Sequence, residues 1–143
     1  LATYLERRMA LCADPVSAIR EWIRGMAAQA EDPAGARASR PFALARGRLA
    51  DEFPAEVREA QETATAPLKR ALEEAAEAGL LSEGDPDRDA ETVYHLVMGW
   101  VEARLVEARS PDESEVTRLE NFALGGLSRA GAPSPSTETH GAE

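Results

Sequence analysis

Apolar residues recur every three to four positions along most of this chain, which is the spacing of one face of an α-helix. The strict alternation and β-branched runs that are typical of strands do not occur. The pattern predicts helices over residues 1–12, 15–30, 42–51, 54–81, 87–109 and 111–128. We therefore expect an all-α fold, an antiparallel helical bundle of about six helices.

Prolines and capping residues mark the expected helix boundaries. Asp14-Pro15 is typical of a helix start, with aspartate as the N-cap and proline at the first helical position. Ser110-Pro111-Asp112-Glu113 has the spacing of a capping box for the last helix. Residues 32–41 contain two prolines and a glycine and are predicted as a loop. Pro67 lies inside the long helix and predicts a kink there.

The last two predicted helices carry more apolar surface than one layer can cover. The helix over 87–109 is apolar on two sides, so it should be covered on two sides. The simplest cover is a second copy of the same helix pair, which gives a four-helix interface with two-fold symmetry. The alternative is that these faces pack on the rest of the monomer. The residues expected at the dimer interface are Leu96, Trp100, Ala103, Leu119, Phe122 and Gly126.

Length and composition favour one domain over residues 1–128. Residues 129–143 are rich in Gly, Pro, Ser and Thr without an apolar period, which predicts a disordered tail. The chain begins with Leu1 rather than methionine and opens directly on a helical pattern. We therefore expect that further residues preceded it.

The charge balance makes this chain a poor ligand for nucleic acid on its own. It has 16 Lys and Arg against 26 Asp and Glu, a formal net charge of −10, and its arginines alternate with carboxylates. DNA-binding surfaces need clustered positive charge, and anionic membranes repel this balance. No apolar run is long enough to span a membrane, and the single cysteine suits a reducing compartment. A cytoplasmic protein is expected.

Few residues offer catalytic or metal chemistry. No nucleophile elbow, phosphate-cradling loop or paired carboxylate set occurs, so we expect neither an enzyme nor a bound cofactor. Glu91 and His95 have a spacing that could hold a metal, but a solvated pair is favoured because no third ligand is evident. Cys12 is expected to be a small buried hydrophobic residue rather than a redox sensor.

Three segments follow one another in the order and spacing of motifs from one protein family. Residues 41–53 read PFALARGRLADEF, residues 89–100 read DAETVYHLVMGW, and residues 111–127 end in FALGGL. They are similar to G-C-x-L-x-x-x-A-x-E-x, A-x-x-L-x-x-L-x-x-G and F-x-L-x-G-L in the C-terminal regulatory domain of TetR (tetracycline-repressor-like) transcription regulators. Pro41 and Phe42 replace the common glycine and cysteine of the first motif. The family's N-terminal helix-turn-helix is not in this chain.

The resemblance implies the effector-binding and dimerisation domain of a ligand-responsive regulator, a repressor. In such a homodimer a small apolar effector sits among the helices of residues 1–109 and shifts the first helix. DNA would be contacted only through a region absent from this chain. The alternative interpretation is a helical dimerisation or interaction module without a ligand site.

The resemblance also suggests which residues line the ligand site. Aromatic and methionine side chains adapt to varied apolar ligands, although each such residue could equally fill an ordinary core. The Tyr94 hydroxyl needs a partner if buried, and it could orient a polar group of the ligand. The candidate ligand-binding residues are Trp22, Met26, Phe42, Phe53, Leu68, Leu72, Tyr94 and Met98.

Overall fold

The computed structural model describes residues 1–82 and 84–129 of the chain. These residues form six helices and no strand, which confirms the predicted all-α fold. The tail predicted over 129–143 lies outside the described residues, apart from Arg129 at the end of the last helix. The helices are α1 (Ala2–Met9), α2 (Pro15–Glu31), α3 (Pro33–Glu52), α4 (Pro54–Glu77), α5 (Pro86–Glu107) and α6 (Glu113–Arg129).

Asp-Pro pairs begin α2, as the sequence predicts, and also α5. The Asp14 side chain accepts a hydrogen bond from the backbone N–H of Ser17 at 2.9 Å. The Asp85 side chain accepts from the backbone N–H groups of Asp87 and Arg88. In both helices the proline occupies a position whose N–H would lack a partner within the helix, so it is tolerated there.

The loop predicted over residues 32–41 is wrong, because these residues form the first half of α3. Asp32 accepts a hydrogen bond from the Gly35 backbone N–H at 2.7 Å, and Pro33 follows it at the first helical position. The helix then continues through Pro41 to Glu52. A well-capped start therefore outweighs the one backbone hydrogen bond that Pro41 removes.

The capping box of α6 lies two residues beyond its predicted place. The Asp112 side chain accepts from the Glu115 backbone N–H at 2.9 Å, and the Glu115 side chain accepts from the Asp112 N–H at 3.1 Å. Pro111 precedes this pair and is buried. Asp112 and Glu115 have the spacing required of a capping box, and two carboxylates at a helix N-terminus are stabilised by its dipole.

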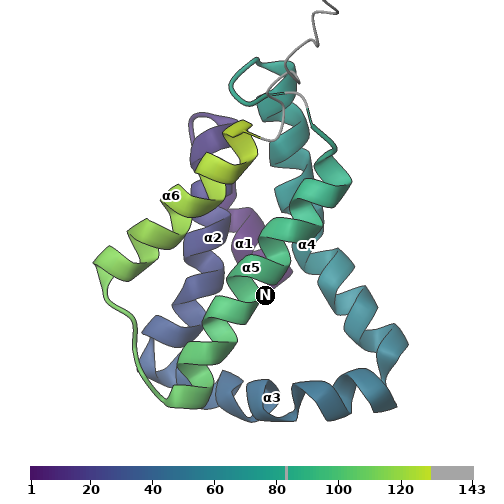
Figure 1. Ribbon diagram of the computed structural model, residues 1–143, viewed down its shortest axis with the longest axis vertical. Coiled ribbons are helices and arrows are strands. Elements are labelled where there is room, and N and C mark those ends of the chain that lie inside the picture. The colour runs from purple at the N-terminus through teal and green to yellow at the C-terminus, as the bar shows by residue number, and fades with distance from the viewer. Residues whose placement is uncertain (83, 130–143) are drawn as a thin grey trace, which may run out of the picture.

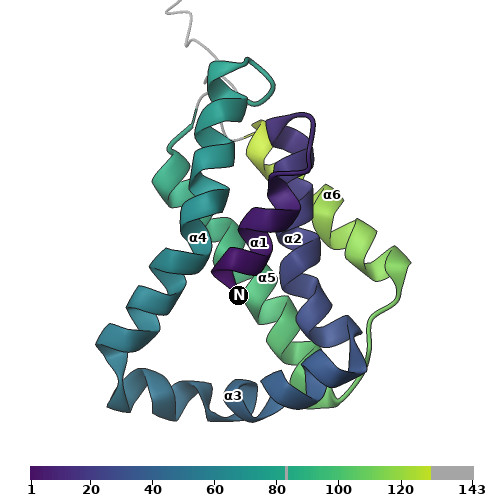
Figure 2. The ribbon, with the colours of Figure 1, turned by 180° about the vertical axis from the view of Figure 1, so that it is seen from behind.

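Three helices form a triangular frame around the middle of the molecule. Figure 1 shows α3 along the base, α4 and α5 as the two sides, and α6 beside α2 at the left. Figure 2 shows the same triangle from behind, with α1 between α4 and α2. Helix α2 packs against all five other helices and holds the arrangement together. We call α3, α4 and α5 the triangular frame.

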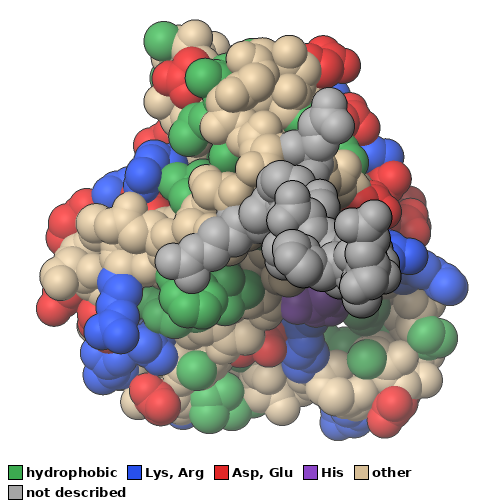
Figure 3. All heavy atoms as spheres, turned by 45° about the horizontal axis from the view of Figure 1, so that its top comes forward, with side chains coloured by type: hydrophobic (Ala, Val, Ile, Leu, Met, Phe, Trp, Pro, Cys, Tyr) green, Lys and Arg blue, Asp and Glu red, His purple; other side chains and the backbone are tan. Residues whose placement is uncertain are grey.

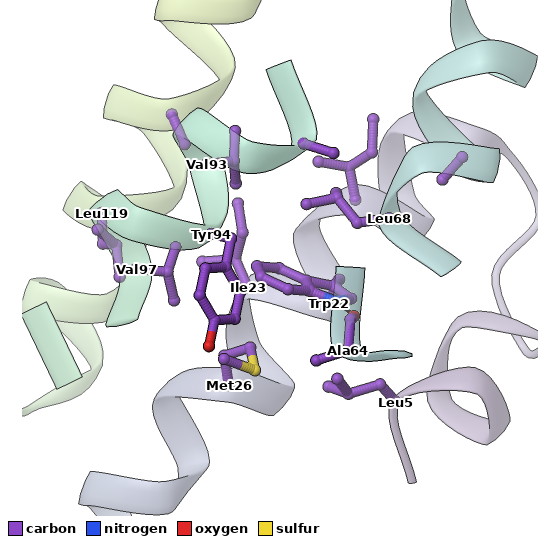
Figure 4. Packing of buried hydrophobic residues seen from close by; sticks show 14 of the residues in the cluster. Leu5, Trp22, Ile23, Met26, Ala64, Leu68, Val93, Tyr94, Val97 and Leu119 are labelled. Atoms are coloured by element: carbon purple, nitrogen blue, oxygen red, sulfur yellow. Dashed lines mark hydrogen bonds between the residues drawn. The ribbon is translucent and has the colours of Figure 1, made fainter. Parts of the chain in front are cut away.

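The hydrophobic core lies on one side of the frame and is centred on Trp22. Its indole N–H donates to the backbone carbonyl of Ala64 at 2.9 Å, which ties α2 to α4. Figure 4 shows Trp22 among Leu68, Ile23 and Leu5. Every helix except α3 contributes buried residues to this core. All residues of α3 are described, and none of them is buried.

Helix α4 changes direction near its middle, as Figures 1 and 2 show. Pro67 lies in this region, is buried, and removes one backbone hydrogen bond. The predicted kink therefore has its expected cause. The bend lets the second half of α4 pack on the core while the first half leans outward to meet α3.

A buried carboxylate fastens α6 to α2. Glu120 is 2% exposed and lies between two arginines of α2. Its Oε2 accepts a hydrogen bond from Arg20 Nη1 at 3.1 Å, and its Oε1 forms an ion pair with the Arg24 Nε. This pairing fixes which face of α6 turns inward and which remains outside.

Candidate functional site

A hollow lies inside the triangular frame and has two adjoining parts that share Val57. The wide part has a volume of about 730 Å³ and lies between α4, the start of α5 and the end of α3. The narrow part has a volume of about 250 Å³ and lies between α3 and α5, with Gln29 of α2 at its wall. We call the two parts together the central hollow. The hollow arises because α3 meets α4 and α5 at the corners of the frame and buries none of its own residues.

Apolar side chains line most of the narrow part. They come from three helices and include Phe42, Ala43, Leu49, Val57, Met98, Val101 and Leu105. Such a surface binds an apolar molecule by removing both from water.

Tyr94 supplies a polar group to this apolar wall. The residue is 8% exposed, and Figure 4 shows its hydroxyl reaching the edge of the core beside Met26. No hydrogen bond joins this hydroxyl to any described residue, although Tyr94 lines the narrow part. The hydroxyl oxygen is not among the fully buried atoms that lack a partner, so it faces accessible space and is available to a polar group of a bound molecule.

An ion pair closes one side of the narrow part. Arg46 of α3 is paired with Glu102 of α5, and both residues line the hollow. The two residues stand 56 positions apart in the sequence. The pair therefore links two sides of the frame directly across the hollow.

The wide part is more polar. Lys69 of α4 and Asp87 of α5 form an ion pair at 2.6 Å, and the hydrogen bond that Lys69 donates to the Asp87 carboxylate raises the pKa of Lys69. Glu91 and His95 lie 3.9 Å apart on the same wall, and both side chains are more than half exposed. No group of three residues able to hold a metal occurs in the described part of the chain. These charged and exposed side chains keep the wide part hydrated, so it can serve as a water-filled entrance to the apolar narrow part.

The structure brings together three of the predicted ligand-binding residues: Phe42, Tyr94 and Met98 all line the narrow part. Phe53 caps the end of α3 at a corner of the frame, is 49% exposed, and lines neither part of the hollow. The other four belong to the filled core, where each is at most 4% exposed and touches no part of the hollow; they are Trp22, Met26, Leu68 and Leu72.

Several lining residues lie outside the predicted set. Val101 and Leu105 share a helix face with Tyr94, so the spacing from Tyr94 could have identified them. Val57 and Leu49 face the hollow from α4 and α3. Only the placement of these two helices in space brings them together. Nothing local signals the Arg46–Glu102 pair, because its members are distant in sequence.

A second candidate site is the outer face of α5 and α6, which we call the α5–α6 apolar face. Phe122 is 72% exposed and Val106 is 46% exposed, while Leu96, Trp100 and Ala103 are half-buried. Three glycines of this face have open space beside them. Apart from the glycine's chain neighbours and its own helix backbone, no described atom lies within 4 Å of the position that a Cβ atom would take. These glycines are Gly99, Gly125 and Gly126.

The predicted interface residues divide between this face and the interior. Leu96, Trp100 and Ala103 are partly exposed and Phe122 and Gly126 are exposed, so all five keep surface that a partner could cover. Leu119 is only 6% exposed and belongs to the monomer core, so it offers little surface to a partner. Its place follows from Glu120, which turns the neighbouring positions of α6 toward α2.

The remaining candidates show ordinary surroundings. Cys12 is half-buried, and its thiol lies 3.8 Å from the Arg8 carbonyl. Burial raises the pKa of this thiol, which makes the reactive thiolate less available. Figure 3 shows acidic and basic side chains intermixed on the face turned to the reader, with apolar side chains grouped between them. None of the helices in the described residues could cross a membrane.

Comparison with known proteins adds no relative to this description. No protein-family model, curated protein or solved structure matches the chain.

Proposed function

We propose that this chain is the effector-binding and dimerisation domain of a TetR-like, ligand-responsive transcription regulator, a cytoplasmic repressor released from DNA by a small apolar molecule. The observation that carries the proposal is the central hollow, with an apolar narrow part and the Tyr94 hydroxyl in its wall. In this proposal the chain is not an enzyme. DNA is contacted only by a region outside the chain.

The hollow is placed so that a ligand can act on α1. A molecule between α3, α4 and α5 contacts the first half of α4, while α1 packs against α2 and the second half of α4. Leu5 of α1 lies so close to Gly25 of α2 that an added Cβ would stand 2.6 Å from it. Glu6 of α1 also pairs with Arg70 of α4 at 3.0 Å. A shift of α4 would therefore move α1, and DNA-binding heads carried by α1 would move with it.

The α5–α6 apolar face supports the dimerisation part of the proposal. Its large side chains are exposed or half-buried, and its glycines leave room for close approach of a second pair of helices. A two-fold axis through this face would bring each pair onto its own copy and bury Phe122. The two hollows would then lie on either side of the interface.

Ligand binding is tested by thermal unfolding with a panel of small apolar compounds. A ligand present at about a hundred times its Kd adds about 2.7 kcal/mol of stability, which raises Tm by several degrees. The variant Ala60→Phe places a ring inside the narrow part, where Ala60 is a lining residue, and should abolish the shift. Ala55→Phe is the matched control, because Ala55 is exposed on the same helix outside the hollow.

The same experiment distinguishes the effector-binding domain from the alternative function, a dimerisation module. A dimerisation module without a ligand site would form dimers, yet no compound would raise its Tm. The filled core around Trp22 favours this alternative, because four predicted ligand residues lie there and leave no space. A compound that stabilises the wild type and Ala55→Phe, but not Ala60→Phe, decides for the effector domain. A panel without any such compound decides for the module.

A further inference from the structure

Four arginines surround a separate pocket at another corner of the molecule. They are Arg37 and Arg40 near the start of α3, Arg104 near the end of α5, and Arg109 just beyond it. The pocket has a volume of about 240 Å³, and of its described lining residues only Leu105 also belongs to the central hollow. In Figure 1 this corner is where the start of α3 meets the end of α5. We call it the arginine pocket.

Only part of this positive charge is neutralised within the chain. Arg109 donates two hydrogen bonds to the Glu115 carboxylate, at 2.7 and 2.9 Å, and Arg104 lies 3.5 Å from the same carboxylate. Neither Arg37 nor Arg40 forms an ion pair with any described carboxylate. A chain with a net charge of −10 thus gathers uncompensated positive charge at one pocket.

Two of the arginines are held in position. Arg40 Nε donates to the backbone carbonyl of Leu105 at 3.1 Å, which leaves its terminal nitrogens without a described partner. The Arg104 guanidinium stacks over the Trp100 ring, 4.8 Å from the ring centroid. Guanidinium groups that are already fixed lose less entropy when they bind an anion.

The rest of the pocket is apolar. Ala30, Pro33, Ala36, Leu105 and Ala108 line it between the arginines. Such a surface favours a ligand with an apolar body in addition to its charge. Inorganic ions alone would leave this surface wet.

We propose that the arginine pocket binds a small organic anion, with a carboxylate or phosphate head held by Arg37 and Arg40 and an apolar body on the alanine and proline wall. Planar guanidinium groups match the oxygen pairs of both head groups and bind them through charge-assisted hydrogen bonds. The site is distinct from the central hollow in place and in chemistry. It does not depend on the function proposed above.

Calorimetric titration of the full chain with three probes tests the proposal. Benzoate and phenyl phosphate combine a ring with a negative head, whereas benzyl alcohol has the ring without the charge. We expect at least one of the two anions to bind at least tenfold more tightly than benzyl alcohol, and to weaken as salt is raised. The preferred anion identifies the head group. Equal affinity for all three, or no binding by either anion, overturns the proposal.

Matched variants test whether the anion binds in the arginine pocket. Arg37→Gln removes an arginine that makes no described bond, so it leaves the fold intact, and Arg40→Gln removes the second uncompensated charge. Each should weaken anion binding about tenfold, since a hydrogen bond to a charged group is lost. Arg7→Gln is the control, because Arg7 is exposed on α1, has no described ion pair and lines no part of the pocket. Equal loss in Arg37→Gln and Arg7→Gln would show that net charge alone attracts the anion and would refute the site.

Discussion

At the scale of single residues, burial separates side chains that share one sequence pattern. Trp22 and Met98 both fit the expected profile of a ligand-binding residue, yet Trp22 fills the core and Met98 lines the hollow. The periodicity predicts that each faces inward. It does not say whether another side chain already occupies the space inward of it, because that depends on helices distant in sequence.

The buried Glu120 carboxylate gives a residue-scale prediction. Glu120→Gln keeps the shape of the side chain but leaves Arg20 without a counter-charge and Arg24 paired with Glu113 alone. We expect a loss of about 1–3 kcal/mol in the free energy of unfolding, less than for a fully buried pair because both arginines remain partly hydrated. Urea denaturation at one fixed protein concentration measures it.

The control for this substitution is Glu91→Gln. Glu91 is also paired, with His95, but both side chains are more than half exposed. Its loss should change the free energy of unfolding by no more than about 0.5 kcal/mol. If the two variants are equally stable, Glu120 does not fasten α6 as we describe.

At the scale of the element, most helix starts could be predicted because their signals are local. The chain places aspartate before proline at 14–15, 32–33 and 85–86, and each pair begins a helix. The sequence pattern predicts a loop at the middle pair because Gly35 and Pro41 follow it. The capping residue Asp32 can be identified in the sequence. The pattern does not show whether this cap stabilises a helix more than Gly35 and Pro41 destabilise it.

The capping box of α6 gives an element-scale prediction that depends on pH. The hydrogen bond from Arg109 and then that from the Asp112 N–H lower the pKa of Glu115 from 4.5 to about 2. Because the pKa is lower in the folded chain, the ionised carboxylate favours folding. This stabilisation is complete above the unfolded value of 4.5 and is lost as the pH falls toward 2.

Comparison of the wild type with Glu115→Gln across pH measures this effect. The wild type should be the more stable at pH 7, and the difference should shrink between pH 4.5 and 2. Ser114→Ala serves as the control, because it lies in the same helical turn and removes no titrating group. A stability difference for Glu115→Gln that stays constant down to pH 2 would contradict the proposed role of the carboxylate.

At the scale of the whole molecule, the sequence predicted the number of helices but not the space between them. The central hollow exists because α4 bends away from the core and α3 bridges its far end to α5. Those features join residues far apart in the chain, such as Arg46 and Glu102. Amphipathic spacing describes which face of a helix is apolar, but not whether that face meets another helix or a cavity.

The α5–α6 apolar face is the feature on which the dimerisation part of the proposed function depends. The sequence predicts that the helix over 87–109 is apolar on two sides. In the single chain the structure leaves Phe122 of the neighbouring helix exposed. Exposed apolar patches on a protein surface commonly mark interaction sites. We infer that a second copy covers it, since this makes the same patch complementary to itself.

Sedimentation velocity at micromolar concentration tests this central claim directly. The wild type should sediment as a species of about twice 15.4 kDa. Phe122→Arg should sediment as a monomer, because the side chain is exposed in the single chain and a charge there would be buried unpaired in the dimer. Leu44→Arg, which alters an exposed leucine of α3, should remain dimeric. A wild type that sediments at 15.4 kDa throughout this range would contradict the account.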